Sequence, residues 1–194
     1  MFTIKKCDVN MAEKVKIDID NWKTNTYTLD VFAQISYDDE GFIVKFTTIE
    51  ADPVREKTEH FQFVHQDSCA EFFVNFTPET SDRYLNLETN ANGVMNVSFR
   101  KDRYESFPLL KEEVDGFNIT PKIYDDYWTV EYKVGFDFIK KYYPDFDINT
   151  CEYVTGNLYK CNDAKPILLT HFPINHEKPD FHRPEYFQKI PVEK

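Results

Sequence analysis

Apolar and polar residues alternate with a period of two along much of the chain, which is the pattern of β-strands with one buried face. In the clearest run, from Val31 to Tyr37, every second residue is apolar. The segment 38–41 then supplies acidic and glycine turn residues, and the alternation resumes over 42–46. Residues 29–46 are therefore predicted to form a β-hairpin.

Further segments show the same alternation and are separated by turn signals such as Asn92-Gly93; they span residues 70–76, 84–90, 95–99, 128–134 and 167–172. Strands of this length and spacing predict an all-β fold of two packed antiparallel sheets. One short helix is expected near 137–143, where Pro144 would end it. The proline-rich stretch 171–191 predicts an extended loop, followed by an edge strand near 190–192.

Length and charge limit the functional classes. The chain of 194 residues is expected to form a single domain over 1–194 with a full hydrophobic core. Its net charge of −11 and its scattered basic residues argue against a nucleic-acid partner, because phosphate contacts need clustered Lys and Arg. No apolar stretch approaches the roughly 20 residues that cross a bilayer, so no membrane partner is expected.

The N-terminal residues 1–10 contain no apolar run of the kind found in signal peptides. We therefore expect a cytoplasmic protein, with secretion after removal of a leader as the alternative. The four cysteines form no CxxC pair and are expected to be reduced and partly buried; they are Cys7, Cys69, Cys151 and Cys161. A structural zinc site would need ligand pairs closer together in the sequence.

The strand 84–90 carries an unusual polar face, since its residues opposite Leu85 and Leu87 are one aromatic, two amides and one carboxylate: Tyr84, Asn86, Glu88 and Asn90. The preceding strand adds Glu71 and Asn75 on the face opposite its apolar residues. Amides and carboxylates bridge adjacent sugar hydroxyls, and aromatic rings stack on the apolar face of a sugar. A carbohydrate-binding face is the sharper interpretation, and a solvated outer sheet face is the plainer one.

Four sequence blocks carry a family resemblance: Asp67–Phe73 (DSCAEFF), Tyr84–Asn90 with Gly93, Gly156–Asp163, and Pro179–Phe187. Their order and spacing over residues 25–192 resemble the family 9 carbohydrate-binding modules and their stand-alone relatives. The resemblance implies a β-sandwich with jelly-roll-like strands and a non-catalytic sugar site, in which two tryptophans clamp the ring at the end of a glucan or xylan chain.

Carried over residue by residue, the resemblance implies that Glu71 is an acidic ligand contact and that Phe181 stands at one clamp position. Lys160 falls near a position where the family uses an amide. The other clamp tryptophan is missing, and only His65 or Phe63 stands where it would be. Trp22 and Trp128 lie elsewhere in the sequence, and Trp128 is expected in the core.

Arg183 is the cation most readily placed at the site, because its planar guanidinium suits paired hydroxyls or a uronic-acid carboxylate. An equal alternative is a loop anchor that pairs with a buried carboxylate such as Asp67. The complete predicted ligand-binding set is His65, Glu71, Asn86, Glu88, Lys160, Phe181 and Arg183.

Two other functions compete with sugar binding. The first is a glycosidase, in which Glu71 and Glu88 would face each other across the scissile bond. The second is a β-sandwich without a sugar site that would bind another protein through an exposed apolar patch. No cofactor and no metal–histidine site are expected. A structural calcium ion at Asp38–Glu40 or at Asp125-Asp126 is the alternative to plain charged turns.

Overall fold

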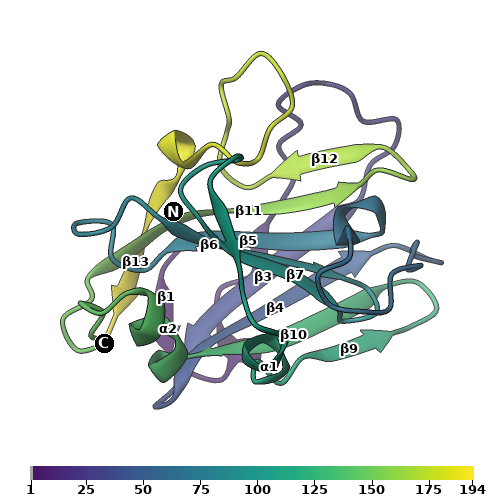
Figure 1. The fold of residues 1–194 in the computed structure, drawn as a ribbon. Coiled ribbons are helices and arrows are strands. Elements are labelled where there is room, and N and C mark those ends of the chain that lie inside the picture. The colour runs from purple at the N-terminus through teal and green to yellow at the C-terminus, as the bar shows by residue number, and fades with distance from the viewer. Residues whose placement is uncertain (1) are drawn as a thin grey trace.

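The computed structural model describes residues 2–194, and its regular secondary structure is mostly β-strand (Figure 1). One half of the fold contains β1 (Ile4–Lys6), β2 (Val15–Lys16), β3 (Asp30–Tyr37), β4 (Gly41–Ile49), β9 (Thr120–Ile123) and β10 (Trp128–Gly135). The other half contains β5 (Cys69–Asn75), β6 (Tyr84–Asn90), β7 (Met95–Arg100), β8 (Ser106–Pro108), β11 (Tyr153–Asn162), β12 (Ile167–Thr170) and β13 (Gln188–Glu193).

Helical segments are short. The two α-helices are α1 (Lys111–Asp115) and α2 (Phe136–Tyr142), and the 3-10 turns are η1 (Val9–Met11), η2 (Val64–Gln66) and η3 (Pro184–Tyr186). The prediction of a helix near 137–143 is confirmed, but the prediction of a single helix is wrong. Helix α1 has only five residues, which is too short for a 3.6-residue period to be visible in the sequence. Within residues 2–194, no helix has the length and apolar character needed to cross a membrane.

The strands run in the order β8-β7-β6-β5-β11-β13-β1-β3-β4-β10-β9, with β12 on β11 and β2 on β3. The all-β class is confirmed, but the purely antiparallel arrangement is wrong, because β1 pairs in parallel with both β3 and β13. These parallel pairs join the two halves into one curled, mixed sheet, and the jelly-roll order is not confirmed. Period-two patterning shows which face of a strand is buried but not the direction of its partner.

The hairpin 29–46 is observed as β3 and β4, which pair antiparallel from Asp30 to Tyr37. Strand β13 is not the predicted edge strand, since it lies between β11 and β1. Strand β11 was not identified from the pattern, although it is central in its half of the fold (Figure 1). Both of its faces are buried along most of its length, so polar and apolar residues do not separate.

The main core lies between the two halves of the curled sheet. Strand β5 contributes Ala70, Phe72 and Val74, and strands β3, β4 and β10 contribute the opposing apolar residues. Trp128 is fully buried in this core, as expected.

The outer face of β5, β6 and β11 is also covered. A second, smaller cluster contains Phe73, Tyr84 and Tyr159 from these strands, together with Phe181 and Ile174 from the loop between β12 and β13. The plainer alternative of a solvated outer sheet face is therefore wrong, since β5 and β6 are buried over their whole length. The covering loop forms one wall of a cleft.

Candidate functional site

A cleft of about 440 Å³ lies on the outer face of the sheet formed by β5, β6, β7 and β11. Strand residues form its floor: Glu71, Glu88, Asn96, Arg100 and Cys161. Phe63 and His65 beside η2 form one wall, and the loop segment from Pro179 to His182 forms another.

Glu71 and Glu88 meet in this cleft because β5 and β6 pair with these two residues directly opposite each other. Residues opposite one another across antiparallel strands project to the same side, with Cβ atoms about 4.5–5.5 Å apart. Both carboxylates are nearly buried, with 3% and 4% of their surface exposed. The sequence-based prediction that they share a face is thus confirmed.

Glu88 is held by donors from the neighbouring strands. The Asn86 side-chain amide donates to Glu88 Oε1, and Asn96 Nδ2 donates to Glu88 Oε2 at 3.1 Å. Ser98 Oγ donates to Asn86 Oδ1 at 2.6 Å, and Arg100 Nε donates to Ser98 Oγ at 2.7 Å. This chain of hydrogen bonds across β6 and β7 presets the positions of a carboxylate and a guanidinium in the cleft.

Burial dominates the electrostatics of both acids. Desolvation, together with the charges of Cys161 and Glu88, raises the pKa of Glu71 well above its usual range. Desolvation also raises the pKa of Glu88, and outweighs the hydrogen bond from Asn96 and the charge of His65. His65 Nδ1 lies 4.0 Å from Glu88 Oε2.

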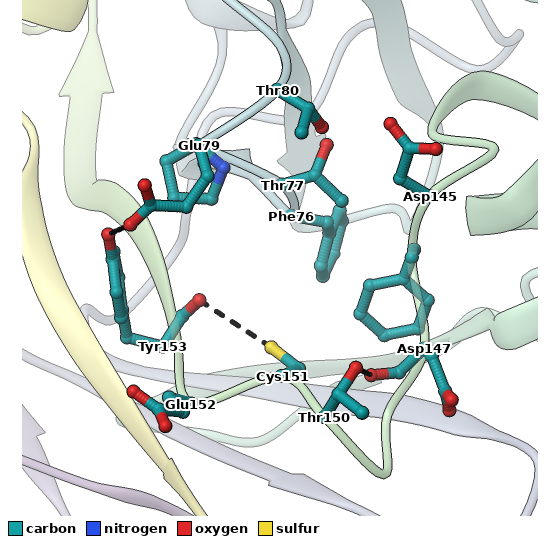
Figure 2. Close-up of a pocket in the computed structure, with 12 residues that line it drawn as sticks. Phe76, Thr77, Glu79, Thr80, Asp145, Asp147, Thr150, Cys151, Glu152 and Tyr153 are labelled. Atoms are coloured by element: carbon teal, nitrogen blue, oxygen red, sulfur yellow. Dashed lines mark hydrogen bonds between the residues drawn. The ribbon is translucent and has the colours of Figure 1, made fainter.

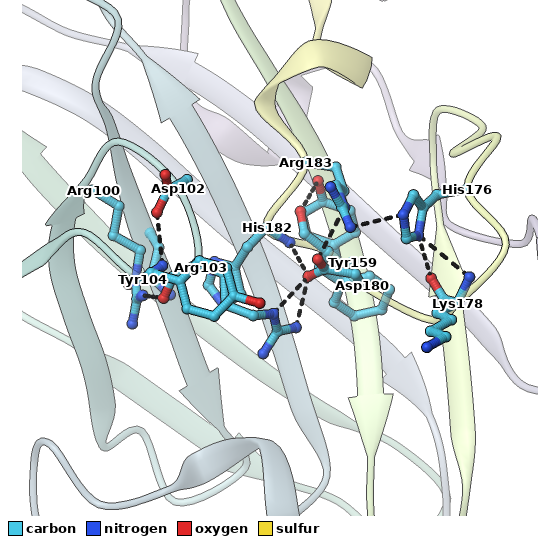
Figure 3. Close-up of polar contacts among 12 residues, drawn as sticks. Arg100, Asp102, Arg103, Tyr104, Tyr159, His176, Lys178, Asp180, His182 and Arg183 are labelled. Carbon is cyan, nitrogen blue, oxygen red and sulfur yellow. Dashed lines mark hydrogen bonds and ion pairs between the residues drawn. The ribbon is translucent and has the colours of Figure 1, made fainter.

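The loop wall is attached to the β7–β8 connection through Asp180 (Figure 3). Arg103 Nε and Nη2 both donate to Asp180 Oδ1, at 3.0 and 2.6 Å, and Arg183 Nε lies 2.9 Å from Oδ2. Burial by itself would raise the pKa of Asp180, but the Arg103 hydrogen bonds and charge outweigh it and lower the pKa. The loop is thus held by a carboxylate between two guanidinium groups.

The aromatic residues divide into buried and exposed groups. Phe181 stacks on Tyr159 with ring centroids 4.3 Å apart and is only 8% exposed. Trp22, far away in the sequence, contacts the same ring at 5.9 Å. Phe63 is 64% exposed and packs against His65 at 5.6 Å. The accessible aromatic surface of the cleft is therefore supplied by Phe63 and not by Phe181.

Most of the residues predicted for the ligand site are at the cleft. His65, Glu71, Glu88 and Phe181 line it, although Phe181 is only 8% exposed. Asn86 lies behind the cleft, where it is fully buried and orients Glu88.

The prediction that Lys160 binds ligand is wrong. Lys160 pairs with Ala70 on β5, whereas Tyr159 pairs with Glu71, so the Lys160 side chain projects into the core. It is fully buried, its Nζ lies 3.7 Å from Glu50 Oε2, and it faces the Trp128 ring at 6.0 Å. A shift of one residue along a strand reverses the face.

Arg183 is not among the residues that line the cleft, so the structure gives no support to its assignment as a ligand contact. Its guanidinium contacts Asp180, and its Nη2 lies 2.7 Å from His176 Nε2 (Figure 3). The alternative of a loop anchor is confirmed, with Asp180 in place of Asp67. Asp67 instead accepts hydrogen bonds from the Lys57 backbone N–H and from Asn90.

Residues that sequence reasoning missed include Asn96, Arg100, Arg103, Asp180 and His182. Asn96 and Arg100 had a usable signal, because they alternate with the apolar residues of β7 and continue the polar face of β6. Arg103 and Asp180 lie on loops, where no periodicity places a side chain.

A second cavity, of about 260 Å³, lies at the opposite end of the β5–β11 pair (Figure 2). Two of the four acidic residues that line it have local hydrogen-bond partners: Asp147 Oδ1 accepts from both Asn149 nitrogens at 2.9 and 3.0 Å, and Tyr153 donates to Glu79. At the predicted calcium turn, Asp38 and Glu40 both bind the Lys133 ammonium, at 2.7 and 2.9 Å.

His182 provides a pH-dependent contribution to stability. Burial, followed by the charges of Arg100 and Arg103, lowers its pKa to about 3, while its Nδ1 lies 2.9 Å from the Tyr84 hydroxyl. An unfolded histidine titrates near pH 6.5. Between these values the unfolded chain binds one more proton, so the free energy of unfolding should fall as pH drops from about 6.5 toward 3.

We expect His182→Phe to flatten this pH dependence, because phenylalanine preserves the stacking on Phe73 but cannot titrate. Urea unfolding at a series of pH values measures the slope. An unchanged slope in the variant would contradict the assignment to His182. The matched control is His176→Phe, at the histidine six residues before His182 in the sequence.

The comparisons with known proteins agree with this architecture. The model of carbohydrate-binding family 9 matches residues 3–192, and the chain therefore belongs to this family. A search of curated proteins finds no match.

Solved structures of similar fold include a Bacteroides uniformis ATCC 8492 protein provisionally described as carbohydrate-binding. It is 22% identical, has a TM-score of 0.81, and the match covers 100% of this chain and 98% of that one. A family 9 module from Caldicellulosiruptor kristjanssonii in complex with glucose is 11% identical, with a TM-score of 0.69 and coverage of 100% and 95%. A family 9 module from the same organism in complex with cellotriose is 11% identical and has a TM-score of 0.70, and the match covers 99% of this chain and 93% of that one.

Proposed function

We propose that this chain is a non-catalytic carbohydrate-binding domain whose ligand occupies the cleft above Glu71 and Glu88. The observation that carries the proposal is the convergence of two nearly buried carboxylates, an amide and a guanidinium beneath an exposed aromatic ring, in a chain of carbohydrate-binding family 9. Buried polar groups of this kind discriminate strongly for a ligand that completes their hydrogen bonds.

Each group has a distinct role in the proposal. Glu71 and Glu88 accept hydrogen bonds from sugar hydroxyls, and Asn96 and Arg100 donate to them. Arg100 lines the cleft, and its Nε and Nη1 are held by Ser98 Oγ at 2.7 Å and the Arg103 carbonyl at 3.1 Å. The guanidinium is therefore oriented before the ligand arrives, which lowers the entropy lost on binding.

The ligand class we propose is a monosaccharide or the end of a glucan- or xylan-type chain. The glucose and cellotriose complexes of the two family 9 modules support this choice. A cleft of about 440 Å³ is large enough for one or two sugar rings, within the range of small-molecule sites. The proposed sugar contacts need no cofactor. The structural calcium ion and the cytoplasmic location remain predictions.

Calorimetric titration with glucose, xylose, cellotriose and xylotriose tests the proposal. We expect saturable binding of at least one of these sugars, and a loss of affinity of about 10- to 100-fold in Glu88→Ala, because a hydrogen bond to a charged group contributes about 1.5–3 kcal/mol. Glu79→Ala, at an exposed carboxylate of the second cavity, is the control. No binding by the folded protein would refute the proposal.

Hydrolysis is the second candidate, because Glu71 and Glu88 stand directly opposite each other and burial raises the pKa of both. A glycosidase needs one carboxyl that is protonated near neutral pH and a second that is ionised. Turnover of a chromogenic β-glucoside that disappears in Glu71→Gln would establish this function and displace the non-catalytic one.

A further inference from the structure

Two cysteines and a carboxylate converge at the floor of the cleft. Cys69 on β5 and Cys161 on β11 pair directly across the antiparallel strands, and Glu71 follows two residues after Cys69 on the same face. Glu71 Oε1 lies 3.0 Å from Cys161 Sγ and 3.8 Å from Cys69 Sγ. One ligand atom from each of the three residues lies within 4.8 Å of the other two.

The Glu71 carboxylate has only weak hydrogen-bond partners in this position. Among residues 2–194, the hydrogen-bond partners of its carboxylate are only the two thiols, which are weak donors. Glu88 on the next strand, by contrast, accepts from two side-chain amides. A buried carboxylate with such weak partners costs several kcal/mol unless a cation or strong donors compensate.

We propose that Cys69, Glu71 and Cys161 form a zinc-binding site at the floor of the cleft, with the fourth coordination position open toward the cleft. Two thiolates and one carboxylate are a ligand set that suits Zn²⁺ better than the hard cations Ca²⁺ and Mg²⁺. Zinc–ligand bonds of about 2.0–2.3 Å place tetrahedral ligand atoms about 3.5 Å apart. The separations of 3.0 and 3.8 Å need little adjustment to reach that geometry.

The open position follows from the lining of the cleft. Glu71 and Cys161 both border it, whereas Cys69 is fully buried behind them. Three protein ligands with access for a fourth define a site that holds water or an exchangeable ligand, in contrast to a closed structural site. The inference does not depend on sugar binding, because the metal would be held by the protein alone.

Binding of Zn²⁺ would require the Cys69 and Cys161 thiols to lose their protons. Burial raises the pKa of the Cys69 thiol to about 12, and the hydrogen bond with Cys69 together with burial raises the pKa of the Cys161 thiol. Both thiols are therefore protonated without metal. Zn²⁺ enters as two S–H bonds lose their protons to solvent and two Zn–S bonds form, with no oxidation or reduction.

The test is titration of the reduced, folded chain with Co²⁺, a spectroscopic substitute for Zn²⁺. We expect one Co²⁺ per chain, a thiolate-to-cobalt charge-transfer absorption band, and displacement of Co²⁺ by Zn²⁺. Cys69→Ser and Cys161→Ser should each reduce the band, since one thiolate remains, and weaken binding by more than about 100-fold, which exceeds the loss of an outer-shell group. The double variant Cys69→Ser/Cys161→Ser should abolish the band. Glu71→Gln should retain the band, because both thiolates remain, and should weaken binding, because a neutral amide oxygen is a poorer zinc ligand than a carboxylate.

The chain supplies a matched control in its other two cysteines, which lie outside the cluster. Cys7→Ser/Cys151→Ser should bind Co²⁺ as the wild type does. If the serine variants of the cluster unfold, the charge-transfer band of Cys7→Ser/Cys151→Ser gives an independent readout, because the only thiols left in that variant are Cys69 and Cys161. Absence of the band in the folded wild type, or its survival in Cys69→Ser/Cys161→Ser, would overturn the proposal.

Discussion

Replacing Phe63 by alanine is expected to weaken sugar binding about 10- to 100-fold and to leave the free energy of unfolding almost unchanged. The ring is 64% exposed at the cleft and packs on His65, so it contributes contact area to a ligand and little to the core. Covering a phenylalanine side chain with apolar surface contributes about 1.5–3 kcal/mol, which gives this range of affinity. Calorimetry with the best sugar and urea unfolding measure the two quantities.

Phe107→Ala is the matched control, because Phe107 is similarly exposed, at 55%, and does not line the cleft. It should change neither affinity nor stability by much. Phe181→Ala is expected to destabilise the fold, since its ring is stacked on Tyr159 and nearly buried. If Phe63→Ala binds as tightly as the wild type, the stacking surface proposed here is wrong.

Lys160→Ala is expected to lower the free energy of unfolding by about 3–5 kcal/mol, the usual effect of removing one partner of a buried ion pair. Lys160 is fully buried beside Glu50, which also accepts from Trp128 Nε1 at 3.0 Å and from Ser68 Oγ at 2.8 Å. Alanine would leave the Glu50 charge in the core without its counter-charge. Chemical denaturation measures the loss, and sugar affinity of the remaining folded protein should not change.

The double variant Lys160→Met/Glu50→Gln is the control for this interpretation. It removes both charges and retains side-chain volume, so it should be more stable than Lys160→Ala. A folded, stable Lys160→Ala that no longer binds sugar would instead return Lys160 to the ligand site.

Strand identity was predictable where a strand has one apolar face toward the main core. Strands β3, β4, β6 and β10 follow the alternation closely, because their polar and apolar residues separate onto two faces. Strand β11 gives no such signal, since a covering loop buries its second face as well. The three-residue β1 is too short to show a period at all.

The floor of the cleft was partly predictable for the same reason. Glu71 and Glu88 both stand on the side opposite the core residues of their strands, so alternation alone put them on one face. Alternation could not place Lys160 in the same way, because β11 is buried on both faces. The face of the Lys160 side chain follows only from the register of β11 against β5. The proposed zinc ligands Cys69 and Cys161 are 92 residues apart along the chain but pair directly across β5 and β11, so spacing in the sequence does not detect their proximity.

The amino-acid sequence by itself determined the all-β class, the short helix before Pro144, the membership of carbohydrate-binding family 9 and the shared face of the two acids. These properties depend on local periodicity and on blocks of residues that are contiguous in the chain. The tertiary structure was needed for the parallel pairing of β1, the placement of Arg103 and Asp180, and the finding that Phe63, rather than Phe181, is the accessible ring. These properties depend on strand partners and on a covering loop, and such long-range contacts leave no period in the sequence.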